Sequence, residues 1–95
     1  MADFEQILSV LMDNAIKYSD KVIRVKLSEH LLIVSNDGKT ISPEKLPHIF
    51  ERFYQADKTT EGVGLGLAIA KSVANRNHWK LEVKSNRITV FILKF

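Results

Sequence analysis

Cysteine is absent from this 95-residue sequence, which also has only four glycines and two prolines. Without cysteine, the chain can form no disulfide, no thiolate zinc site and no cysteine nucleophile. No apolar run approaches the roughly 20 residues that a membrane helix needs, and no basic stretch followed by an apolar one marks a signal peptide at the N-terminus. We therefore expect a cytoplasmic domain that does not itself contact a membrane.

Long runs of one charge are also missing. The sequence has 14 Lys and Arg against 11 Asp and Glu, a formal net charge of +3, and the basic residues are spread along the chain without interleaved aromatics. A nucleic-acid groove is therefore unsupported, although the charge alone would suit a nucleic acid or a small polyanion such as a nucleotide. Hydrophobic residues make up 45% of the chain, which is typical of a single folded domain.

The apolar spacing predicts the order helix, hairpin, helix, loop, helix, hairpin. The predicted elements are a helix at about 3–18, strands at 22–27 and 31–34, a short helix from Ser42 to about Phe50, a polar loop at 51–63, a helix at 64–77, and strands at 79–84 and 87–94. Hairpins rather than strand–helix–strand crossovers favour an α+β fold. We expect a two-layer α/β sandwich whose mainly antiparallel or mixed sheet of about four strands carries three helices on one face.

An amide interrupts the apolar stripe of the first helix. With Ile7 set at zero on an ideal helix, Leu11 lies at about +40° and Asn14 at about −20°. Lys17 and Tyr18 follow near the same C-terminal end. Asn14 could hydrogen-bond the backbone of an ordinary amphipathic helix, or its carbonyl oxygen could bind a hard cation beside an ammonium that binds phosphate.

Three alternating glycines, Gly62, Gly64 and Gly66, precede the second long helix. They would let the backbone approach an anion that faces the helix N–H groups, or they could form a flexible hinge. The pattern is not a P-loop, because no Lys-Ser or Lys-Thr follows it. It is not a Rossmann fingerprint either, because a polar loop precedes it and the spacing differs.

Two further segments have an ordinary interpretation and a functional one. Ser35-Asn36-Asp37-Gly38 could be a simple turn at the end of a strand. Phe50 and Phe53 could be core residues, or they could anchor a lid ahead of the glycine-rich segment.

The order and spacing of these segments resemble those of sensor histidine kinases. Asn14-Ala15-Ile16-Lys17-Tyr18-Ser19 is similar to the N box of that family, and Asn36-Asp37-Gly38 is similar to its first glycine motif. Phe50-Glu51-Arg52-Phe53-Tyr54-Gln55-Ala56-Asp57 is similar to the F box. The segment from Gly62 to Lys71 is similar to the second glycine motif. The resemblance implies that residues 1–95 are an ATP-binding catalytic domain of the Bergerat-fold superfamily. Gyrase, chaperone and mismatch-repair ATPases share that superfamily.

The resemblance also implies roles for particular residues. Asn14 would coordinate the Mg²⁺ that bridges the ATP phosphates, and Lys17 would contact phosphate oxygens. These two are therefore the implied catalytic residues, and Asn14 is also the implied metal ligand. The other implied nucleotide contacts are Tyr18, Asn36, Asp37, Gly38, Arg52, Lys58, Gly62, Gly64, Leu65, Gly66, Leu67 and Thr89.

Several positions depart from the family pattern. Asn36 stands where the family has the Asp that reads adenine; an amide can accept from the adenine amine, but it is uncharged and its orientation is ambiguous. Thr40 and Trp79 replace usual glycines, the lid is short, and the strand ahead of the first helix is missing. Val10 stands where gyrase-like relatives have a general-base Glu, so hydrolysis to free phosphate is not the expected activity.

The resemblance implies transfer of the γ-phosphoryl group of Mg·ATP to a histidine on a separate dimerisation and phospho-acceptor domain, with a response regulator downstream. His30, His48 and His78 lack the sequence context of an acceptor. We therefore expect the acceptor elsewhere in a longer protein that is anchored in the cell membrane. Two alternatives stay open: a nucleotide-binding or scaffold module without transferase activity, and a serine kinase of the anti-sigma type, which the F-box resemblance disfavours.

Overall fold

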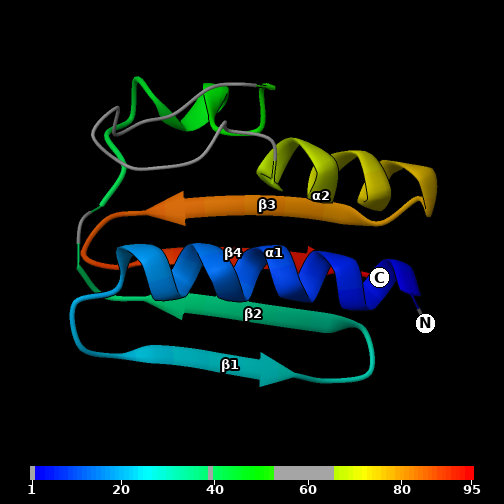
Figure 1. The fold of residues 1–95 in the computed structure, drawn as a ribbon, viewed down its shortest axis with the longest axis horizontal. Helices are drawn as coiled ribbons and strands as arrows, with labels where there is room; N and C mark the ends of the chain where they lie inside the picture. The colour runs from blue at the N-terminus through cyan, green and yellow to red at the C-terminus, as the bar shows by residue number, and fades with distance from the viewer. Residues whose placement is uncertain (1, 39, 53–65) are drawn as a thin grey trace.

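In the computed structural model, which describes residues 2–38, 40–52 and 66–95, two helices pack on a four-stranded sheet (Figure 1). The elements are α1 (Ala2–Tyr18), β1 (Ile23–Leu27), β2 (Leu31–Asn36), the 3-10 helix η1 (Leu46–His48), α2 (Gly66–Arg76), β3 (Lys80–Ser85) and β4 (Thr89–Lys94). The strands lie in the order β1-β2-β4-β3, and each neighbouring pair is antiparallel. The expected α+β fold with an antiparallel sheet of four strands is therefore confirmed. None of the helices in these described ranges is long and apolar enough to cross a membrane.

The expected third helix is not confirmed. Between Ser42 and Phe50, where the sequence predicts a short helix, the structure has only the three-residue η1. Pro47 lies in the first turn of η1. Because proline has no amide hydrogen and its ring clashes with the carbonyl four residues earlier, Pro47 prevents an α-helix that began at Ser42 from continuing.

The core lies between the two α-helices and the sheet face that they cover. Side chains alternate between the faces of a strand, so every second residue of β2 and β4 points into this core. The buried apolar residues are Ile7, Leu11 and Ala15 of α1, Ala70, Val73 and Ala74 of α2, Leu32, Val34, Leu81, Phe91 and Leu93 of the strands, and Ile49. One shared core therefore fixes both helices on the same side of the sheet.

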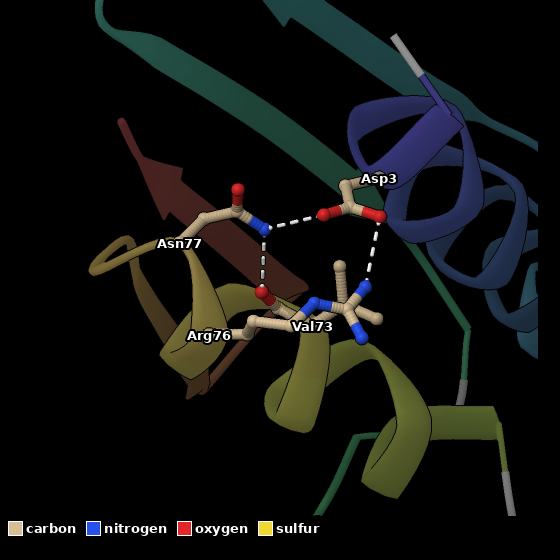
Figure 2. A network of polar contacts seen from close by, with 4 residues as sticks. All are labelled: Asp3, Val73, Arg76 and Asn77. Carbon is tan, nitrogen blue, oxygen red and sulfur yellow. Dashed lines mark hydrogen bonds and ion pairs between the residues drawn. The ribbon is translucent and has the colours of Figure 1, made fainter.

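A polar cluster joins the beginning of α1 to the end of α2 (Figure 2). The Nδ2 group of Asn77 donates to Asp3 Oδ2 at 2.8 Å and to the carbonyl oxygen of Val73 at 2.9 Å, and Arg76 donates to Asp3 Oδ1 at 2.9 Å. The hydrogen bond from Asn77 lowers the pKa of the Asp3 carboxyl, and Arg76 lowers it further. This cluster ties the helices together at the end of the molecule where both chain termini lie (Figure 1).

At the opposite end, Asp37 ties the end of α1 to the end of β2. Its Oδ1 atom accepts hydrogen bonds from the backbone N–H groups of Asp20, Lys21 and Val22, at 3.1, 2.9 and 3.0 Å. The hydroxyl of Ser19 donates to the same oxygen at 3.0 Å. These hydrogen bonds, that of Val22 first, lower the pKa of the Asp37 carboxyl to about 2. We call this contact between residues 19–22 and residues 37–38 the Asp37 junction.

Gly38 completes the junction because no other residue fits at its position. Its φ is +96°, and a Cβ atom there would lie 2.5 Å from the carbonyl oxygen of Tyr18 and 2.9 Å from the amide nitrogen of Asp20. Both atoms belong to the backbone, so a side chain at residue 38 would push the end of α1 away from β2. Residues 36–38 are therefore more than an ordinary turn, since they dock on the helix.

The lowered pKa of Asp37 predicts a dependence of stability on acid. Because the folded pKa is about 2 and the ordinary value is 3.8, the ionised carboxylate stabilises the fold above pH 3.8, and this contribution is lost as the pH falls through about 2. Over that interval, we expect the free energy of unfolding to fall more steeply in the wild-type chain than in Asp37→Asn, with the two curves converging in acid.

Urea unfolding at a series of pH values measures this difference. Asp3, Glu44 and Glu82 also have lowered pKa values, but they are common to both proteins and cancel in the comparison. Two parallel curves over the whole pH range would contradict the assignment of the Asp37 hydrogen bonds.

Candidate functional site

A row of polar side chains interrupts the apolar face of the sheet at one end. Asn36 of β2 pairs with Thr89 of β4, and Thr89 pairs with Ser85 of β3. Paired residues in antiparallel strands point to the same face, with Cβ atoms about 4.5–5.5 Å apart. Asn36 and Thr89 are only 3% and 4% exposed. The register thus places side by side two residues that lie far apart in the sequence and that the family resemblance implies as nucleotide contacts.

Ser85 also belongs to this row, although it was not among the site residues expected from the sequence. Its Oγ atom lies 2.9 Å from Thr89 Oγ1, within hydrogen-bonding distance. The same oxygen accepts a hydrogen bond of 2.8 Å from the backbone N–H of Ile41. Ser85 therefore connects the chain that follows the first glycine motif to the floor of the site. Its position beside the β3–β4 turn was the only available signal.

The orientation of the Asn36 amide is fixed by its neighbour. Its Nδ2 group donates to the backbone carbonyl of Asp37 at 2.6 Å. The flipped amide would place two carbonyl oxygens at that distance, which is strongly repulsive, so hydrogen bonding favours the orientation with Nδ2 toward Asp37. Oδ1, which can only accept hydrogen bonds, lies on the other side of the amide.

The last turns of α1 lie at the same end of the sheet as this polar row (Figure 1). Asn14 and Tyr18 are half-buried there, and Lys17 is exposed. The ammonium of Lys17 lies 5.8 Å from the centroid of the Tyr18 ring. Because a Cβ atom on residue 38 would lie 2.5 Å from the carbonyl oxygen of Tyr18, the backbone that follows Asn36 closely approaches the end of α1.

Part of the F box meets the second glycine motif over the sheet. Phe50 packs edge to face on Phe91, with ring centroids 6.3 Å apart and an interplanar angle of 78°. The ammonium of Lys71 lies 5.3 Å from the centroid of the Phe50 ring and donates to the carbonyl of Leu81 at 2.9 Å. Phe50 is thus a core contact located where the two motifs converge, and Lys71 is a structural residue that the sequence interpretation did not single out.

The structure describes only some of the remaining residues of the implied site. Gly66 begins α2, and a Cβ atom there would lie 3.5 Å from Val10 Cγ1, so the helix start packs beside α1. Leu67 is half-buried and Arg52 is exposed. The other implied contacts, together with the second aromatic residue of the F box, lie outside the described residues: Lys58, Gly62, Gly64, Leu65 and Phe53.

A separate shallow pocket opens at the neighbouring edge of the sheet. It has a volume of about 170 Å³ and is lined by Val22, Arg24, Ser35, Asn36, Asp37 and Ile88. Arg24 pairs with Ser35, one residue out of phase with the helix-covered row, so both project from the opposite face of the sheet. Ligand pockets for molecules of nucleotide size are about 300–1,000 Å³, so this hollow is too small to be the principal site.

The described residues contain no group of three or more His, Cys, Asp or Glu side chains that could hold a metal ion. A cation at this site would therefore need most of its ligands from a bound molecule or water. Asn14 suits that arrangement, because an amide oxygen is a hard ligand and the side chain is half-buried at the polar end of α1.

Comparison with known proteins agrees with this arrangement. Residues 2–95 match the family described as histidine kinase-, DNA gyrase B-, and HSP90-like ATPase. The chain is 45% identical over 89 residues to the sensor histidine kinase YkoH of Bacillus subtilis, a match that covers 85% of this chain and 20% of YkoH. It is 40% identical over 96 residues to the heme sensor protein HssS of Staphylococcus aureus strain JH9, covering 93% of this chain and 21% of HssS. The chain thus spans about a fifth of the length of these curated relatives.

Solved structures share the fold. The mycobacterial sensor histidine kinase MprB superposes with a TM-score of 0.81 at 24% identity, covering 97% of this chain and 70% of that one. The catalytic domain of the histidine kinase ThkA gives a TM-score of 0.75 at 26% identity, covering 99% and 67%. The resemblance inferred from the four motifs is confirmed: the chain belongs to the family of histidine kinase-, DNA gyrase B- and HSP90-like ATPase domains, and the relatives that it matches are sensor histidine kinases.

Proposed function

We propose that the chain binds Mg·ATP and transfers its γ-phosphoryl group to a histidine on a separate dimerisation and phospho-acceptor domain. The observation that supports this most strongly is the convergence of two polar groups of residues at one end of the sheet. Asn14 and Lys17 come from α1, while Asn36 and Thr89 come from the buried polar row. The acceptor domain would belong to the rest of a longer, membrane-anchored sensor kinase that passes the phosphoryl group to a response regulator.

The polar row would bind the adenine ring. With its amide nitrogen engaged by the carbonyl of Asp37, Asn36 presents Oδ1 as an acceptor for the exocyclic amine of adenine. Thr89 lies beside it and would contact the same end of the base. Guanine has a carbonyl oxygen in place of that amine, so the fixed amide would disfavour it.

The end of α1 would bind the phosphates. Asn14 would give one oxygen ligand to Mg²⁺, which typically keeps several waters and takes its other ligands from the substrate phosphates. Lys17 would contact phosphate oxygens, and Tyr18 would form a wall of the pocket. The resemblance assigns the remaining contacts to Asp37, Gly38, Arg52, Lys58, Gly62, Gly64, Leu65, Gly66 and Leu67.

Phosphoryl transfer requires the protein mainly to position the γ-phosphate and to offset its charge. Mg²⁺, when bound, would neutralise phosphate charge, and Lys17 would add a positive charge beside it. Val10 is half-buried against the start of α2 and carries no group that could activate water. These residues favour transfer to an acceptor over hydrolysis.

A second candidate is a nucleotide-binding or scaffold module without transferase activity, which Asn36 in place of the family Asp favours. The two are separated by incubating the chain with labelled ATP and the acceptor domain of its parent protein. A histidine kinase produces acid-labile phosphohistidine, and the label is lost when the acceptor histidine is replaced by glutamine. Nucleotide binding without labelling would support the scaffold, and acid-stable phosphoserine would indicate a serine kinase.

The orientation of Asn36 predicts base selectivity. Asn36→Ala removes the acceptor for the adenine amine, so we expect ATP affinity to fall about tenfold, the equivalent of about one hydrogen bond. The preference for ATP over GTP should shrink with it. Calorimetric titration of both nucleotides measures the ratio, with Asn75→Ala, an exposed residue on α2, as the matched control. An unchanged ATP-to-GTP ratio in Asn36→Ala would show that another residue reads the base.

A further inference from the structure

We propose that Asp37 is a positioning residue of the nucleotide site: its carboxylate holds the end of α1 that carries Asn14 and Lys17 against the end of β2 that carries Asn36. This inference rests on the proposed function, because it assumes that these two ends form one site. It differs from the family resemblance, which implies that Asp37 contacts the nucleotide itself.

The hydrogen bonds of Asp37 define this role. Three consecutive backbone N–H groups and one hydroxyl, all from residues 19–22, converge on Oδ1 at 2.9–3.1 Å. Successive N–H groups that point to one centre form a concavity suited to an anion. Here the anion is a side chain of the same protein, 15 to 18 residues further along the sequence. Oδ1 of Asp37 is therefore already engaged in tertiary contacts.

The junction is directly continuous with the nucleotide-facing part of α1. The last hydrogen bond that continues the helical pattern runs from the N–H of Ser19 to the carbonyl of Ala15 at 2.8 Å. No linker separates the helix from the segment that Asp37 holds, because α1 ends at Tyr18. A displacement of residues 19–22 would therefore move the last turn of α1, which carries Lys17 and Tyr18.

Asp37 is equally continuous with the adenine end of the site. It follows Asn36 directly, its carbonyl accepts the Asn36 amide at 2.6 Å, and its own N–H donates to the carbonyl of Val22 at 3.2 Å. The side chain of Asp37 thus engages the helix end, while its backbone orients the residue proposed to read adenine. One residue is in contact with both halves of the site.

The Asp3–Asn77 cluster provides a matched control for a purely stabilising contact. It also joins secondary-structure elements through a carboxylate, but it lies at the other end of α1 (Figures 1 and 2). A helix of 17 residues is about 25 Å long. Loss of this cluster should therefore lower stability without moving the site.

The test compares Asp37→Ala, Asp37→Asn and Asn77→Ala in the 95-residue chain. Mg·ATP affinity is measured by calorimetry well below the unfolding midpoint of each variant, and the midpoints are recorded by circular dichroism. We expect Asp37→Ala to weaken binding by at least about tenfold, because small misplacements of binding groups carry large penalties. Asp37→Asn keeps an acceptor oxygen and should weaken binding less. Asn77→Ala should lower the midpoint and leave affinity unchanged.

A second measurement requires no nucleotide. In ¹⁵N-resolved spectra of the free chain, Asp37→Asn should shift the signals of Lys17, Tyr18 and Asn36, whereas Asn77→Ala should not. If Asp37→Ala does not fold, Asp37→Asn carries the comparison in both measurements.

The two levels of the hypothesis fail in different ways. Absence of Mg·ATP binding by the folded wild-type chain would overturn the proposed function, and the free-chain spectra would still test the positioning. Wild-type affinity in Asp37→Ala (in Asp37→Asn if the alanine variant does not fold), or an equal loss of affinity in Asn77→Ala, would overturn the positioning role while leaving the proposed function intact.

Discussion

One carboxylate oxygen, Asp37 Oδ1, connects α1 to the sheet at the end of the domain that carries the proposed nucleotide site. It accepts four hydrogen bonds from the segment that leaves α1. Gly38 allows the two backbones to approach more closely than a side chain would permit. Without this junction, α1 would still pack on the core through Ile7 and Leu11. The junction adds a direct polar connection between the residues that follow the last turn of α1 and the end of β2.

The polar row shows how the fold accommodates polar side chains at the end of an apolar core. Most of the helix-covered sheet face is apolar and buried, and only its last register row, from Asn36 through Thr89 to Ser85, is polar. Burying such groups is costly unless they are hydrogen-bonded. Asn36 bonds to the Asp37 carbonyl, and Thr89 lies within hydrogen-bonding distance of Ser85. Polar residues at core positions are expected where function requires them.

The helices and hairpins could be predicted because their apolar periods are regular. The first helix, expected at about 3–18, is observed at Ala2–Tyr18, and all four expected strands are present. The short helix expected from Ser42 to about Phe50 is not confirmed, because Pro47 lies in its middle and only the three-residue η1 forms there. The second strand was expected to end at residue 34, but pairing with β4 extends it to Asn36. Tertiary pairing thus overrode a local turn signal.

The site could be predicted only in part. Motif order selected its candidate residues, but spacing along the chain could not show that Asn36 and Thr89 are sheet neighbours, because strand register depends on packing. The Asp37 junction could not be predicted from the sequence either, since the groups that donate hydrogen bonds to Asp37 lie 15 to 18 residues earlier in the chain. Ser85 and Lys71 were missed for the same reason, as both act through residues from other elements. The roles of all the implied site residues remain predictions, and Lys58, Gly62, Gly64 and Leu65 also lie outside the described residues.

The most direct measurement is an NMR titration of the wild-type chain and of Asn14→Ala. Each protein is titrated in parallel with Mg·ATP, with metal-free ATP and with adenosine. If α1 supplies the metal and phosphate half of one site and β2 the adenine half, Asn14→Ala should abolish the gain in ATP affinity that Mg²⁺ provides. Adenosine binding should be unchanged. An ATP affinity that does not depend on Mg²⁺ in the wild-type chain, or equal losses for ATP and adenosine in Asn14→Ala, would contradict the division of the site between helix and sheet.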